Sequence, residues 1–415
     1  MTSSRQRERM RAGGRLAGLV ASVTLALTAL GVAIGTTATA REDPRPPAPR
    51  QFATVLERVV PGDLVMAGNS NLLRAGGWGS FASADVDGDQ SRICIGRVGR
   101  RGSICADNSS SATVDLPPGA AVIHARLYVA TSVSASVGPL RVRLAGPGDT
   151  TYTDAGLATP EVAKVTEMSD GDTRAVHRQA IWDVTDFIAR RGPGQYTVAD
   201  IVNERAGPWL PYASWGIVVA YELDPASEAA VAAQPPEVQE RFASRTLSWH
   251  DGLAIASRAP LEVEVGGFTI PADRRVFAKS FHLIAHAGPA GFENLLFGGG
   301  PIGNNVTPGD AIAPAGVVIG TDPSCNTIVD VLNDTICALG TPVQTKTPGP
   351  QDYRSSADGV TTSSTSAVDM DIARIPDRYL VPGMTTATVS VDVVGDGAVA
   401  AGVIAVSVDQ PVVAP

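Results

Sequence analysis

The strongest constraint on the fold lies in residues 112–129, where apolar and polar side chains alternate along the chain. Ala112, Val114 and Leu116 are separated by polar residues, which is the pattern of a strand buried on one face. Residues 117–119, Pro-Pro-Gly, then end strand pairing, because proline has no N–H to donate and glycine accepts turn conformations. The pattern therefore predicts two successive strands joined by a turn.

The second of these strands is expected to have two different faces. Apolar side chains make one face, and polar or amphipathic side chains make the other. The apolar face consists of Ile123, Ala125, Leu127 and Val129, and the other face consists of His124, Arg126 and Tyr128. Residues 215–221, WGIVVAY, are apolar at every position except the glycine and indicate a central strand. A short helical turn is expected to begin at Asp183 and to end at the Gly-Pro-Gly of 192–194.

Short strands of this kind recur over most of the chain, separated by turn residues and without long helical periodicity. The predicted fold class is all-β, with antiparallel β-sandwich domains of the jelly-roll or Ig-like kind and a short helical insertion. The expected organisation is a signal peptide at 1–40, a Pro-rich linker at 41–53, a first β-sandwich domain at 54–222, a helical insertion at 223–245 and a second β-sandwich domain at 246–412.

The first 40 residues are organised like a secretory signal peptide. Five arginines lie within the first 15 residues, residues 16–34 are uncharged and mostly apolar, and Ala38-Thr39-Ala40 fits a cleavage site. An uncleaved signal anchor is the alternative, because the apolar run approaches membrane-spanning length. We expect a secreted or extracellular protein that contacts a membrane only if this segment stays attached.

The charge of the chain limits its expected partners. The formal net charge is −9, and removal of the arginine-rich N-terminal segment makes the mature chain more acidic still. An acidic protein repels polyphosphate, so nucleic acid is not an expected partner. A cell-wall glycan or another surface protein is expected instead.

Four cysteines in an exported chain predict disulfides. Cys94 and Cys105 are close in sequence, as are Cys325 and Cys337, and the two pairs lie far apart. We expect each cysteine to pair with its near neighbour, although the sequence alone allows other connectivities.

Asp85, Asp87 and Asp89 form a D-x-D-x-D turn. Carboxylates at alternate positions of a tight loop can converge on a Ca²⁺ ion, and Asp107 or Asn108 could complete such a site. A solvated acidic turn is the more ordinary interpretation. No cofactor is expected apart from Ca²⁺ at this turn.

No catalytic motif is found in the sequence. The chain has no G-x-S-x-G sequence and no free-cysteine signature, so no catalytic residue is assigned and a non-enzymatic protein is expected. The alternative is a secreted hydrolase of glycans that uses two carboxylates as acid and base, because only geometry selects such a pair.

Several segments in order resemble a β-rich module of secreted and wall-associated actinobacterial proteins, often found ahead of Ig-like repeats in surface-anchor-type proteins. They are DVDGD, NSSSATVDLPPGAAVIHARLYV, IWDVTDFI, GPGQYTVADI, SWGIVVAYE, HDGLAI, VEVGGFTIP and GNNV. The resemblance covers most of residues 55–410 and rests on the order of several weak motifs. It implies a non-enzymatic cell-surface binding or structural module, and it names no ligand.

The sequence departs from that module in three respects. Residues 225–243 are an additional insertion, no Ig-like repeat follows residue 410, and no LPxTG-type sorting signal is present. We therefore expect a freely secreted or loosely wall-associated protein.

Overall fold

The structure is a computed structural model, and all the residues that it describes lie in one compact unit, Pro46–Pro415. The described residues are 50–74, 81–88, 93–97, 103–133, 140–153, 160–170, 173–203, 212–224, 244–256, 260–272, 278–286, 292–298, 317–318, 336–338, 341–342, 346–347, 351–354, 361–364, 368–375, 380–394 and 399–410. The predicted signal peptide and most of the predicted linker and helical insertion lie outside these residues.

The predicted all-β class is confirmed, because the described residues are rich in strands and the sheets are antiparallel apart from one parallel pair. The largest sheet, here called the long sheet, has the strand order β19-β18-β23-β15-β25-β13-β1-β12-β7-β10-β9. Its strands are β1 (Arg50–Ser70), β7 (Ala120–Val133), β9 (Val162–Asp170), β10 (Thr173–Asp183), β12 (Ala213–Leu223), β13 (Ser244–Ala256), β15 (Ala278–His286), β18 (Ile336–Ala338), β19 (Thr341–Pro342), β23 (Val368–Ile375) and β25 (Val399–Asp409).

Two smaller sheets and three hairpins complete the described strands. The Ser111 sheet has the order β20 (Lys346–Thr347), β6 (Ser109–Val114), β11 (Gly194–Ala199) and β8 (Arg143–Ala145). The Val389 sheet has the order β14 (Leu261–Val265), β24 (Ala387–Val394), β16 (Phe292–Gly298) and β17 (Val317–Val318). The hairpins pair β2 (Leu72–Arg74) with β3 (Phe81–Ser83), β4 (Ile93–Arg97) with β5 (Ser103–Ala106), and β21 (Gln351–Arg354) with β22 (Thr361–Ser364).

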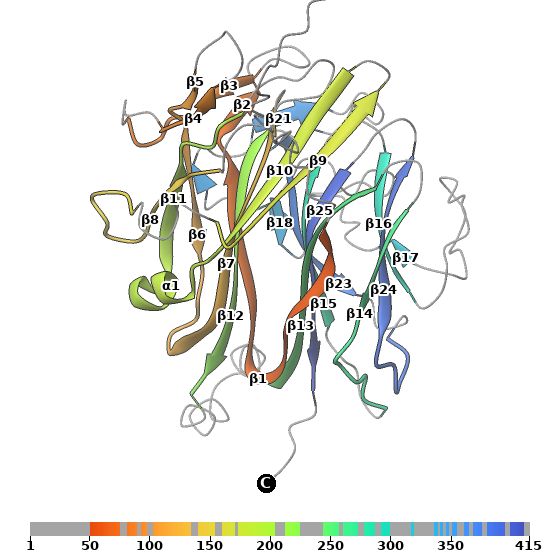
Figure 1. Cartoon of the computed structure of the whole chain (residues 1–415). Helices are drawn as coiled ribbons and strands as arrows, with labels where there is room; N and C mark the ends of the chain where they lie inside the picture. Colours follow the sequence, from red (N-terminus) through yellow and green to blue (C-terminus); the bar gives the residue numbers. More distant parts are fainter. Residues whose placement is uncertain are drawn as a thin grey trace, which may run out of the picture. The chain divides into compact units, whose positions relative to one another are not determined.

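Strand β1 joins the two halves of the long sheet (Figure 1). Its first part, up to Pro61, pairs with β13, and its second part, Gly62 to Ser70, pairs with β12. The strand begins at Arg50, inside the segment expected to be a linker. The hydrogen-bonded sheet is therefore continuous between residues assigned to the two predicted sandwich domains.

Charged residues secure β1 where it changes partner. Asp63 is buried and accepts a hydrogen bond of 2.7 Å from the Ser407 hydroxyl. Buried Arg245 reaches the carbonyl oxygen of Gly62 at 3.4 Å and the carboxylate of Asp409 at 3.0 Å. These contacts connect β1, β13 and β25.

Alternation along the strands divides most of the buried apolar side chains among three large clusters. In the first cluster, Leu127 and Trp215 of the long sheet meet Ala112 and Tyr196 of the Ser111 sheet. In a second cluster, β25 of the long sheet packs on the Val389 sheet. Each small sheet therefore covers one region of the long sheet.

The third cluster lies on the opposite face of the long sheet. It brings Tyr128 and Val218, from β7 and β12, together with Trp249 and Val403, from β13 and β25. The ring centroids of Tyr128 and Trp249 are 6.4 Å apart although β12 and β1 lie between β7 and β13, so the sheet curves around this cluster. Strand β12 is thus apolar on both faces, as residues 215–221 predicted.

One residue of β7, Ile123, lies on the face opposite to the one predicted. Ala125, Leu127 and Val129 belong to the first cluster, but Ile123 packs with the third. The register of β7 against β12 shifts at this point, because Ile123 is an extra residue between two paired ones. Such a bulge reverses the alternation, and period-two reasoning does not include it.

The one helix among the described residues is α1 (Thr185–Arg191), where the sequence predicts a helical turn. Asp183 accepts a hydrogen bond of 2.8 Å from the backbone N–H of Thr185, and Ile188 is buried against the first cluster. Gly192 follows the helix at φ 72°, a conformation that glycine adopts without strain.

Candidate functional site

The outer face of the Ser111 sheet forms the floor of a pocket. Side chains alternate on this sheet, so that Ala112, Tyr196 and Leu144 face the core while their neighbours face outward. Thr197 lies opposite Ser111 on β6 and opposite Ala145 on β8. Three small side chains in register on adjacent strands leave a hollow on the outer face.

Two loops rise beside this floor and border a half-open pocket of about 300 Å³, here called the Asp87 pocket. One loop contributes Val86 and Asp87, and the other contributes residues 149–152. Gln195 lines the pocket beside Thr197. The walls therefore combine carboxylates, hydroxyls and an amide with a few apolar groups.

Tyr152 and Asp87 connect the two walls. The Tyr152 hydroxyl donates a hydrogen bond to Oδ2 of Asp87. The guanidinium of Arg143 lies over the Tyr152 ring, 4.5 Å from its centroid. Burial, followed by the hydrogen bond to Asp87, raises the pKa of the Tyr152 hydroxyl far above its ordinary value. The phenol therefore remains protonated and keeps donating to the carboxylate.

Asp149 is fixed on the other side of the pocket. Its Oδ2 accepts hydrogen bonds from Nε of Arg191 at 2.7 Å and from the backbone N–H of Gly146 at 2.9 Å. The hydrogen bond from Arg191 is the main cause that lowers the pKa of Asp149. This carboxylate is therefore ionised and held in one orientation at neutral pH.

The predicted calcium turn lies at the edge of this pocket. Asp85 is exposed, and its Oδ1 accepts the backbone N–H of Gly88 at 2.9 Å. The carboxyl groups of Asp85 and Asp87 lie within hydrogen-bonding distance, and this contact raises the pKa of Asp85. Asp89 lies outside the described residues, and no group of three metal-ligating side chains occurs among those that are described. The Ca²⁺ site stays a prediction.

Asn108, which we considered as a further calcium ligand, has a structural position. It is buried, and its Oδ1 accepts hydrogen bonds from Asn71 at 2.8 Å and from the backbone N–H of Ile201 at 3.0 Å. Its amide in turn donates to the Ile201 carbonyl at 2.9 Å. These bonds hold the loop before β6 against the end of β11.

The first predicted cysteine pair lies in one hairpin. Cys94 on β4 is directly opposite Cys105 on β5. Directly opposed residues in an antiparallel pair have Cβ atoms ~4.5–5.5 Å apart, close to the spacing of a disulfide. Cys337 lies in β18, and Cys325 lies outside the described residues. Both disulfides stay predictions, and the register supports the first.

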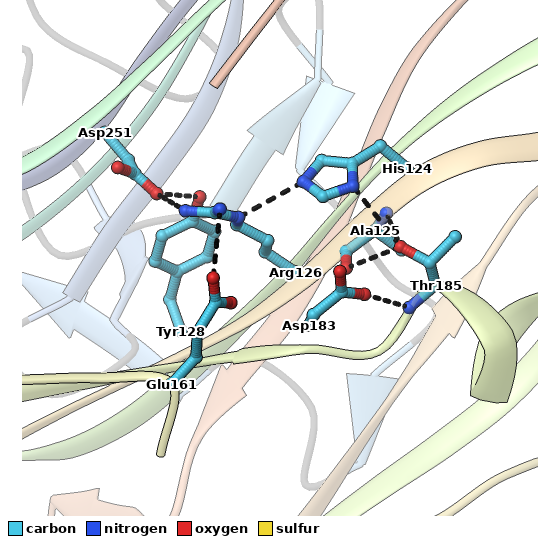
Figure 2. Close-up of polar contacts among 8 residues, drawn as sticks. All are labelled: His124, Ala125, Arg126, Tyr128, Glu161, Asp183, Thr185 and Asp251. Carbon is cyan, nitrogen blue, oxygen red and sulfur yellow. Dashed lines mark hydrogen bonds and ion pairs between the residues drawn. The ribbon is translucent and has the colours of Figure 1, made fainter. Parts of the chain in front are cut away.

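A cluster of polar side chains, separate from the Asp87 pocket, lies between the halves of the long sheet (Figure 2). His124 is 3.3 Å from the Thr185 hydroxyl through Nδ1 and 3.2 Å from Nε of Arg126 through Nε2. Because the arginine can only donate, Nε2 of His124 accepts and the ring hydrogen is on Nδ1. His124 therefore cannot take a proton from Thr185 in this arrangement, and the contacts attach α1 to β7.

The sequence identified only part of the pocket. Asp87 was selected as a metal ligand, but Tyr152, Asp149 and Thr197 were not selected for any role. The available signal was the outward-facing row of Ser and Thr residues on β6 and β11. The loop at 149–152 carried no signal, because only the fold brings it beside Asp87.

Comparisons with protein-family models, with curated proteins and with solved structures give no match for this chain. Among the described residues, no helix is long and apolar enough to cross a membrane.

Proposed function

We propose that the chain is an exported extracellular or cell-surface protein, without enzymatic activity, that binds a cell-wall glycan. Its N-terminal segment has the organisation of a secretory signal peptide, which supports the extracellular location. Its acidic composition argues against nucleic acid as a partner. In this proposal the long sheet and the two small sheets form jelly-roll or Ig-like β-sandwich domains, with a structural role beside the binding role.

The composition of the Asp87 pocket carries the proposal. Hydroxyl groups of Ser111 and Thr197 lie on its floor, 2.7 Å from each other, and Gln195 and Asp87 lie beside them. Hydroxyls both donate and accept hydrogen bonds, and carboxylates accept them. Such a lining matches a ligand whose surface is covered with hydroxyl groups.

A hydrolase is the second candidate, because Asp87 and Asp149 line the same pocket. A glycoside hydrolase needs one carboxyl group that is protonated near neutral pH, which requires a raised pKa. The pKa of Asp149 is instead lowered by Arg191, and Asp85, whose pKa is raised, does not line the pocket. Binding without hydrolysis is therefore the favoured function.

The test uses the mature chain, residues 41–415, with purified insoluble cell-wall glycan. We expect the chain to co-sediment with the glycan, soluble fragments of the same glycan to compete, and no new reducing ends to appear. Absence of co-sedimentation would count against the proposal. Release of reducing ends that Asp87→Asn abolishes would favour the hydrolase.

A further inference from the structure

The charge of the Asp87 pocket restricts its ligand further than its hydroxyl groups do. Among the described residues that line it are two carboxylates, of Asp87 and Asp149, and no lysine, arginine or histidine. Two arginines beside it, among the described residues, are engaged, since Arg191 pairs with Asp149 at 2.7 Å and Arg143 pairs with Asp200. The charges within each of these two pairs balance, so the carboxylate of Asp87 is what makes the potential inside the pocket negative, and an anionic group would enter against its repulsion.

The size of the pocket limits how much of a ligand it can hold. Its volume of about 300 Å³ is at the lower end of the ~300–1,000 Å³ range of small-molecule pockets. One ring of a glycan fits such a volume better than an extended chain does. The pocket is partly open, so the rest of the glycan can extend from the bound ring into solvent.

The arrangement of polar and apolar groups matches one sugar ring. Thr197 and Ser111 can bond to ring hydroxyls from the floor, and the carboxylate of Asp87 is an acceptor for ring hydroxyls at the wall. Val86 and Ala145 supply apolar contacts for the C–H groups of the ring. Of these five residues, Asp87 is the charged one, and it belongs to the loop that forms one wall of the pocket.

We infer that the Asp87 pocket holds a single neutral, hydroxyl-rich sugar ring at the end of a glycan, and that Asp87 excludes anionic sugars. This inference rests on the proposed function, and it adds the ligand's charge class and a specificity-determining residue. The carboxylate of Asp87 accepts hydrogen bonds from ring hydroxyls and repels a uronate carboxylate at the same position.

The test measures binding of neutral methyl glycosides of glucose, galactose and mannose to the mature chain by calorimetry, beside the corresponding uronic acids. We expect at least one neutral glycoside to bind and its uronic acid counterpart to bind at least tenfold more weakly. In Asp87→Asn, the difference in affinity between the neutral glycoside and the uronic acid should become smaller. Thr197→Val, which removes a floor hydroxyl, should weaken binding of the neutral glycoside at least fivefold.

Thr113→Val is the matched control, because Thr113 lies on β6 beside the pocket but does not line it. This variant should bind like the wild type. Uronic acids that bind as tightly as neutral glycosides would overturn the inference, as would binding unchanged by both Thr197→Val and Asp87→Asn. If the chain co-sediments with cell-wall glycan but binds none of the glycosides, the inference is overturned and the proposed function stands. If it neither co-sediments nor binds a glycoside, the proposed function is overturned as well.

Discussion

The guanidinium of Arg126 on β7 lies 2.7 Å from the carboxylate of Asp251 on β13, so one ion pair links the two halves of the long sheet. The Tyr128 hydroxyl donates to the same carboxylate oxygen at 2.9 Å (Figure 2). The Asp251 side chain is fully buried, and that of Arg126 is 14% exposed. A charge of this kind is tolerated in the third cluster because its partners compensate for lost hydration.

Removal of one member of this pair should destabilise the protein strongly. Arg126→Ala leaves Asp251 buried without its cation, and breaking a buried pair in this way costs about 3–5 kcal/mol. Urea unfolding of the variant and the wild type measures the difference.

The exposed pair of Arg58 and Glu222 provides the control for that prediction. Its N···O distance is 2.9 Å, but the two side chains are 50% and 34% exposed. Arg58→Ala should therefore change the free energy of unfolding by less than about 1 kcal/mol. Equal losses from Arg58→Ala and Arg126→Ala would contradict the role assigned to burial.

Stability should fall as the pH is lowered from about 6.5, because of a buried histidine. His177 is fully buried against Tyr212, and burial lowers its pKa from 6.5 to about 3. Between these pH values the unfolded state holds a proton that the folded state lacks, so the free energy of unfolding decreases with falling pH. One such group contributes a slope of ~1.4 kcal/mol per pH unit.

The variant His177→Phe tests this slope. Phenylalanine keeps an aromatic ring beside Tyr212 but binds no proton. The slope of the free energy of unfolding against pH, from urea curves between pH 4 and 6, should be shallower by ~1 kcal/mol per pH unit than in the wild type. Identical slopes in both proteins would mean that His177 does not titrate as its burial requires.

Local patterns in the sequence identified the strands but not how the sheets meet. Alternation at residues 112–129 and the apolar run at 215–221 gave the core faces of β6, β7 and β12, because period two is a local property of a strand. The bulge at Ile123 was missed, since it depends on the register with β12. The length of β1 depends on two different partners, β13 up to Pro61 and β12 from Gly62, and no local pattern predicts such a change of partner.

The candidate site was less predictable than the fold. Asp87 and Tyr152 are separated by more than 60 residues in sequence, and they meet only because β6, β8 and β11 are neighbours in one sheet. Long-range pairing of this kind leaves no periodic signal. The sequence could therefore suggest Asp87 as a ligand but could not indicate the pocket that it lines.

The hairpin of β4 and β5 should contain a disulfide between Cys94 and Cys105. Alkylation of the unfolded, unreduced mature chain should leave both cysteines unlabelled, and a non-reducing digest should yield their two peptides joined. A bridge that closes so short a loop contributes about 2–3 kcal/mol, so the double variant Cys94→Ala, Cys105→Ala should unfold at lower urea concentration. Labelling of either cysteine before reduction would exclude the pair.

Gly62 of β1 should tolerate no side chain, because β12 approaches its backbone closely. A Cβ at this position would lie 2.0 Å from the carbonyl oxygen of Tyr221, which the β1–β12 pairing holds in place. Gly62→Ala must push the strands apart, at a cost of about 1–3 kcal/mol in the free energy of unfolding. Gly266→Ala is the control, since its nearest neighbour is a side-chain methyl group of Thr386 at 3.2 Å, which can move. If Gly62→Ala lowers the free energy of unfolding no more than Gly266→Ala does, then β1 does not need a glycine where it passes from β13 to β12.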